Sequence, residues 1–139
     1  MFLVDTDVLS ALRKRERSRS IVRWVTSRRT GDLYLSVVSI GEVERGIEKQ
    51  RRRNPDFADT LGGWLDDVIR LYGDRILPVD LPTVRRWGRL SQATGRQDAD
   101  LLIAATALEH GLTVVTRNVR HFKPTGVSVL DPSAPAGVG

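Results

Sequence analysis

Oxygen-bearing side chains stand beside several apolar runs of this sequence. In chain order they are Asp5, Glu42, Asp98, Asp100 and the neutral Asn118. Carboxylates gathered at buried strand ends repel one another and are costly to desolvate unless a cation neutralises them. A hard divalent ion such as Mg²⁺ takes oxygen ligands of this kind. If these segments converge in the fold, the residue types predict a metal site.

Each acid also has an ordinary structural interpretation. Residues 39–42 read S-x-x-E, the pattern of a helix capping box. Asp98 or Asp100 could cap the helix that follows, and Asp7 is interpreted as a cap. Asp5 fits a capping role less well, because it directly follows a strand-like run in which aspartate is disfavoured.

The elements that must position these residues alternate along the chain. β-rich runs occupy 2–5, 33–38, 75–80, 113–116 and 127–130, and helical periodicity occupies 21–25, 40–47, 61–72, 84–90 and 101–108. Alternation of this kind predicts a three-layer α/β/α domain with a central parallel sheet of about five strands. Two successive helical patterns between the second and third runs predict a helical hairpin. Ligands of such sheets collect at the carboxyl ends of the strands.

Length and composition restrict the function classes. The 139 residues suit one domain, predicted over 1–131, followed by a small, Pro-rich and flexible tail over 132–139. The absence of cysteine excludes disulfides and thiolate metal sites. The longest apolar run, 101–108, is far shorter than the roughly 20 residues of a membrane span. With no export signal, we expect a cytoplasmic protein with no membrane association.

Net charge points to a polyanionic partner. The formal charge is +5 and the isoelectric point is near 10.4. Positive potential attracts phosphate backbones. Runs of arginine are also common on solvated surfaces, so charge alone leaves nucleic-acid binding and a merely solvated exterior both open.

Three stretches in order carry a family resemblance: FLVDTDVLSAL, SVVSIGEVERGI and DADLLIAATALEHGLTVVTRNVRHF. Together they resemble the PIN-domain ribonucleases, specifically the VapC toxins of type II toxin–antitoxin systems. The resemblance implies that Asp5, Glu42 and Asp100 are the catalytic metal-binding acids. It also implies that Thr6 is the hydroxyl beside the first acid and that Asn118 contributes a carbonyl or a water-mediated contact.

The implied activity is metal-dependent endoribonuclease cleavage. Mg²⁺, or Mn²⁺ in its place, would activate a water for in-line attack on an RNA phosphodiester. The acid directly before LLIAATA in the family corresponds to Asp100, so we expect Asp98 to cap the helix or to add outer-sphere charge. Arg117, Arg120 and His121 could hold RNA phosphates, or could belong to a solvated loop.

The resemblance also implies partners. These are a cognate VapB-type antitoxin, operator DNA bound only through that antitoxin, and a second copy of the chain in a homodimer. Two other functions stay open at this stage. One is a Mg²⁺-binding phosphoacceptor domain of the receiver kind, for which Lys123 is poorly placed, and the other is a non-catalytic nucleic-acid-binding protein.

Overall fold

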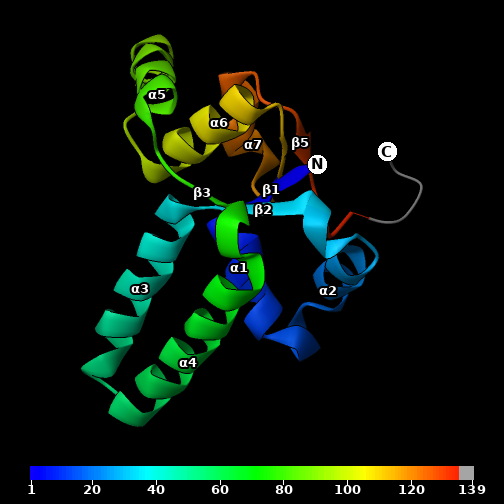
Figure 1. The fold of residues 1–139 in the computed structure, drawn as a ribbon, viewed down its shortest axis with the longest axis vertical. Helices are drawn as coiled ribbons and strands as arrows, with labels where there is room; N and C mark the ends of the chain where they lie inside the picture. Colours follow the sequence, from blue (N-terminus) through cyan, green and yellow to red (C-terminus); the bar gives the residue numbers. More distant parts are fainter. Residues whose placement is uncertain (135–139) are drawn as a thin grey trace.

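In the computed structural model, which describes residues 1–134, five parallel strands form a sheet between two layers of helices (Figure 1). The strands are β1 (Phe2–Val4), β2 (Leu33–Ser36), β3 (Ile76–Leu77), β4 (Thr113–Val115) and β5 (Val129–Leu130). Their order across the sheet is β3-β2-β1-β4-β5, with every neighbouring pair parallel. The predicted α/β/α architecture is confirmed. Residues 135–139, most of the tail that the sequence predicts to be flexible, lie outside the described residues.

Helices α2 to α6 correspond to the five helical patterns in the sequence, whereas α1 and α7 were not predicted. The bounds are α1 (Thr6–Arg13), α2 (Arg19–Thr26), α3 (Val37–Arg51), α4 (Pro55–Tyr72), α5 (Leu81–Thr94), α6 (Ala99–His110) and α7 (Val119–Phe122). Helices α1 to α4 cover one face of the sheet, and α5 to α7 cover the other (Figure 1). None of the helices within residues 1–134 has both the length and the apolar character needed to cross a bilayer.

Successive side chains of the strands point to opposite faces of the sheet and so form two core layers. Val4 and Val115 pack with α1, α2 and α4, whereas Leu3 and Val114 pack with α6 and α7 on the opposite face. Successive side chains of a strand point to opposite faces, so a strand covered on both sides is apolar throughout. Each of these four side chains is fully buried. The apolar runs of the sequence are therefore explained by a sheet with helices on both faces.

Helix ends follow local chemistry. Asn54 accepts a hydrogen bond from the backbone amide of Phe57 and, with Pro55 in the first turn, begins α4. The predicted helical hairpin is confirmed, because α3 and α4 pack side by side through Ile47, Ala58 and Leu65. At the other end of the chain, Gly111 adopts a left-handed φ of 64° and ends α6 just before β4.

The strand order decides which residues can meet. Strands β2 and β4 flank β1 on either side, so the carboxyl ends of all three lie at one edge of the sheet. The backbone amide of Asp5 donates to the Val115 carbonyl at 3.0 Å, which holds the end of β1 against the end of β4. This edge is where the predicted site residues come together.

Candidate active site

A pocket of about 550 Å³ opens at the carboxyl ends of β1, β2 and β4. Its lining residues are Asp5, Thr6, Asp7, Ser10, Glu42, Asp100 and Asn118. All three acids that the family resemblance assigns as metal ligands are therefore at one place, together with Asn118 and Thr6. Asp98, Arg117, Arg120 and His121 do not line this pocket.

Asp5 is the buried carboxylate of the pocket, with an exposed fraction of 4%. It is also the N-cap of α1, because its Oδ1 accepts from the Val8 amide at 2.8 Å. Burial, with a smaller contribution from the nearby charges of Asp7 and Asp100, raises the pKa of Asp5 to about 6, although hydrogen bonds with Thr116 and Val8 oppose the rise. A helix cap does not by itself account for a carboxylate that is this costly to ionise.

Glu42 is held by the first residue of α1. The Thr6 hydroxyl donates to Glu42 Oε1 at 2.6 Å and lies 2.8 Å from Ser39 Oγ. The capping-box interpretation of residues 39–42 is wrong, because α3 begins earlier, with Ser36 accepting from the Val38 amide at 3.0 Å. Glu42 consequently lies in the second turn of α3, facing the pocket instead of the helix end.

Asp100 lies in the first turn of α6 and lines the pocket. Burial raises the pKa of Asp100, and the negative charges of Asp98 and Glu42 add to the rise, while His121 and Arg96 oppose it. The free amides of a helix N-terminus favour a negative charge at this position.

Asp98 occupies the N-cap position of α6, but its side chain makes no capping hydrogen bond. It accepts instead from Arg96 at 2.8 Å and from His121 Nε2 at 2.6 Å. Desolvation works against ionisation, but the hydrogen bonds from Arg96 and His121 hold the pKa of Asp98 below its usual value. The capping role predicted for Asp98 is therefore wrong, and its carboxylate is instead paired with Arg96 and His121.

Asp7 is an acid of the pocket that the sequence analysis assigned to capping. Asp5 takes that role, and Asp7 in the first turn of α1 points to the pocket. Arg117 donates to it through Nε and Nη2, both at 2.8 Å, so this arginine is an ion-pair partner at the edge of the pocket. Arg120 is exposed, and His121 lies in α7, not in a loop as the sequence suggested.

Three further contributors were missed: Ser10, Ser39 and Thr116. Recognising α1 would have revealed Ser10, because it lies four residues after Thr6 and shares its helix face. Ser39 was visible only as the serine of the capping-box pattern, and Thr116 carried no usable signal, since a buried hydroxyl beside an acid depends on which strands are neighbours. Both residues are fully buried.

The donor set fits a hard divalent cation. Four carboxylates and the side chain of Asn118 line the pocket, and no lysine, histidine or arginine is among the described residues that do so. The raised pKa values of Asp5 and Asp100 indicate negative charge that the protein leaves incompletely compensated. Oxygen-only ligands of this kind suit Mg²⁺ or Mn²⁺.

Asp5→Asn should stabilise the metal-free protein near neutral pH. Asparagine caps a helix about as well as aspartate and carries no charge to desolvate. Because the folded-state pKa of about 6 exceeds the ordinary 3.8, this carboxyl stabilises the fold fully below the ordinary value and stops doing so as pH rises through about 6. The difference between the two values corresponds to at most about 3 kcal/mol.

Urea denaturation in EDTA checks this prediction. At about pH 7.5 the free energy of unfolding of Asp5→Asn should exceed that of the wild type by about 1–3 kcal/mol, and at about pH 3.5 the two should converge. A variant that is equally or less stable at neutral pH would contradict the electrostatic account of this residue.

Comparison with known proteins places the chain in a family. The family model described as PIN domain matches residues 2–126. The VapC ribonuclease Y4jK of Sinorhizobium fredii is 32% identical, with 98% of this chain and 100% of that protein covered. Toxin FitB of Neisseria gonorrhoeae is 31% identical, covering 95% of this chain and 98% of that protein.

Solved structures of related proteins support the same family assignment. The structure of FitAcB from Neisseria gonorrhoeae matches with a TM-score of 0.85 and 31% identity, covering 95% of this chain and 98% of that chain. VapBC-1 from nontypeable Haemophilus influenzae matches with a TM-score of 0.73 at 20% identity, covering 96% and 98%, and shows the same fold. The family match, the full-length relatives and the fold together establish that this chain belongs to the PIN-domain family, among its VapC-like members.

Proposed function

We propose that this protein is a metal-dependent endoribonuclease and the toxin of a VapBC-type toxin–antitoxin pair. The observation that carries the proposal is the convergence of Asp5, Glu42 and Asp100 from three separate chain segments on one pocket. Full-length relatives that bear the names ribonuclease and toxin support it. The proposed place of action is the cytoplasm.

Asp5, Glu42 and Asp100 would hold Mg²⁺, with Asn118 contributing directly or through water and Asp98 adding charge from outside the pocket. When bound, the ion would supply an activated water for attack on phosphorus and would offset charge on the phosphate. Asp7 is a further oxygen donor in the pocket, although Arg117 already pairs with it.

The chain's own residues orient these acids. The Val8 amide occupies one oxygen of Asp5, and the Thr6 hydroxyl occupies one oxygen of Glu42. These hydrogen bonds restrict the rotation of both carboxylates at the edge of the pocket. Fixed donors of this kind reduce the reorganisation that the site needs before reaction.

Substrate phosphates would meet cationic groups at the edges of the pocket. Arg117 is partly exposed and could exchange Asp7 for a phosphate oxygen, and Arg120 is exposed nearby on α7. A second groove of about 200 Å³ shares Thr6, Ser10 and Glu42 with the pocket and carries Arg13 and Lys14. We propose that an unpaired RNA strand approaches the acids past these groups.

A phosphoacceptor role fits the site less well. Such a domain would use a lysine close to the acidic pocket. Lys123 begins the short turn after α7 and is not among the described residues that line the pocket. A non-catalytic nucleic-acid-binding role would not explain why the carboxylate of Asp5 is buried, where burial raises its pKa. The nuclease accounts for both the acids and the basic exterior.

The proposed partners are a VapB-type antitoxin, operator DNA reached only through it, and a second copy of this chain. Related structures are toxin–antitoxin complexes, including FitAB bound to a DNA fragment, which matches with a TM-score of 0.88 at 28% identity. Leu71 and Leu81 are exposed at 62% and 70%, and they offer apolar surface for self-association.

Metal removal should abolish RNA cleavage. Dialysis against EDTA should leave no cleavage of total RNA, and added Mg²⁺ or Mn²⁺ should restore it with 5′-phosphate and 3′-hydroxyl ends, because water is the nucleophile. End-labelling of the products measures both points. Cleavage that survives thorough removal of metal, or products with 2′,3′-cyclic phosphate ends, would rule out this mechanism.

Substitution of Asp100 should lower the cleavage rate far more than substitution of Asp98. Asp100→Asn preserves shape but removes a ligand charge, so cleavage should fall at least 100-fold, roughly 3 kcal/mol of activation free energy. Asp98→Asn should lower the rate about tenfold or less, because that carboxylate lies outside the pocket. Rates at saturating Mg²⁺ with matched circular dichroism spectra decide this. An inactive Asp98→Asn beside an active Asp100→Asn would reverse the site assignment.

Expression should reveal the toxin role. We expect expression of this chain alone to slow bacterial growth, and co-expression of the short neighbouring antitoxin gene to restore it. The double variant Asp5→Asn with Asp100→Asn is the control, since it should be harmless. Normal growth with the wild-type chain at confirmed protein levels would count against a toxin.

A further inference from the structure

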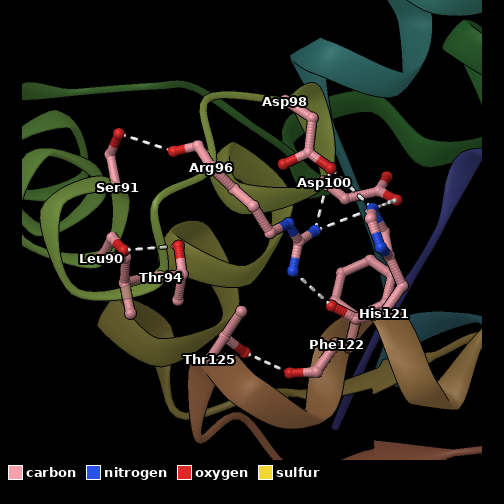
Figure 2. Close-up of polar contacts among 9 residues, drawn as sticks. All are labelled: Leu90, Ser91, Thr94, Arg96, Asp98, Asp100, His121, Phe122 and Thr125. Carbon is pink, nitrogen blue, oxygen red and sulfur yellow. Dashed lines mark hydrogen bonds and ion pairs between the residues drawn. The ribbon is translucent and has the colours of Figure 1, made fainter.

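The connection between α5 and α6 is tied to α7 by one arginine. Arg96 donates through Nη1 to the His121 carbonyl at 2.6 Å and through Nη2 to Asp98 Oδ2 at 2.8 Å. Its own carbonyl accepts from Ser91 Oγ at 2.6 Å. Figure 2 shows the guanidinium lying between Asp98 and His121. Arg96 is thus held at both ends, although it touches none of the pocket-lining acids.

His121 links this arrangement to the candidate metal site. Its Nε2 lies 2.6 Å from Asp98 Oδ2 and 3.2 Å from Asp100 Oδ2 (Figure 2). The same nitrogen also lies 2.7 Å from Arg96 Nη2, so the imidazole joins the guanidinium and the two carboxylates in one cluster. Asp100 also lines the pocket, which leaves its second oxygen available there.

We propose that Arg96 and His121 are positioning residues that hold Asp100 in the orientation required for metal binding, with Asp98 as the anion that connects them. This inference rests on the proposed function. His121 would fix one oxygen of Asp100, and Arg96 would compensate the charge of Asp98, which otherwise repels Asp100 from two residues away. Groups that orient a metal ligand commonly change metal affinity or activity by 10–100-fold.

A second metal site at the same residues is the competing interpretation. Ligand atoms of Asp98, Asp100 and His121 lie within 4.8 Å of one another. The guanidinium Nη2 of Arg96, however, lies 2.8 Å from Asp98 Oδ2 and 2.7 Å from His121 Nε2. A divalent ion there would face a fixed positive charge at contact distance. The protein already supplies the cation for this cluster.

The experiment measures Mn²⁺ binding to the full chain without RNA, by electron paramagnetic resonance of the free ion. His121→Ala removes the imidazole, and Arg96→Gln removes the positive charge of the guanidinium. His121→Gln is the conservative variant, because its amide nitrogen can occupy the place of Nε2 and donate to the carboxylates. Rates of cleavage against Mg²⁺ concentration give a second readout.

Arg86→Gln is the matched control. Arg86 of α5 pairs with Glu109 of α6 at 2.8 Å, so this variant also breaks an arginine ion pair between segments that pack together, away from the pocket. It should lose a similar amount of stability and bind Mn²⁺ as the wild type does.

We expect His121→Ala and Arg96→Gln to weaken Mn²⁺ binding about tenfold, with His121→Gln within about threefold of the wild type. The Mg²⁺ concentration for half-maximal cleavage should rise in parallel, while the rate at saturating Mg²⁺ changes much less. The positioning role would be overturned if His121→Ala and Arg96→Gln both bound Mn²⁺ as tightly as the wild type or more tightly. It would also be overturned if Arg86→Gln lost as much Mn²⁺ affinity as they do. Loss of one of two bound ions in His121→Ala would instead establish the second metal site. A wild-type chain that binds no Mn²⁺ would contradict the proposed function itself.

Discussion

Four carboxylates share one edge of a parallel sheet, and the surrounding structure restrains their mutual repulsion. Burial alone makes Asp5 costly to ionise, and Asp7 and Asp100 increase that cost. Directed hydrogen bonds oppose that cost: the Val8 amide and Thr116 bind Asp5, the Thr6 hydroxyl binds Glu42, and the Arg117 guanidinium binds Asp7. These contacts orient the acids, yet they leave the pocket short of positive charge, and that deficit makes the site receptive to a cation.

The remainder of the fold serves to hold these contacts. A central β1 flanked by β2 and β4 brings the starts of α1 and α3 and the segment that follows β4 to one place. Helix α6, apolar over most of its surface and buried between the sheet and its neighbours, delivers Asp100 from the opposite layer. The acids therefore come from both helical layers, and the pocket depends on the packing of each layer against the sheet.

Asp98 and Asp100 show how two similar residues acquire different roles. They lie two positions apart, Asp98 with an extended backbone just before α6 and Asp100 in the first turn of that helix. Asp100 faces the pocket, whereas Asp98 meets Arg96 and His121 and is already compensated. Asp100 is therefore the acid of the two that the pocket presents to a cation.

The sequence by itself determined the alternation of strands and helices and the hairpin of α3 and α4, because strand periodicity and apolar runs are local properties. Three of the four acids of the pocket, Asp5, Glu42 and Asp100, were indicated by the resemblance of the sequence to a family. Tertiary structure alone decided which hydroxyl, amide or guanidinium meets each acid. Asp7, interpreted as a cap, pairs with Arg117 from the other end of the chain. Ser39, interpreted as part of a capping box, instead lies beside Thr6 from another helix. Such partners are separated by tens of residues, so their meeting depends on strand order and helix packing, which no local pattern encodes.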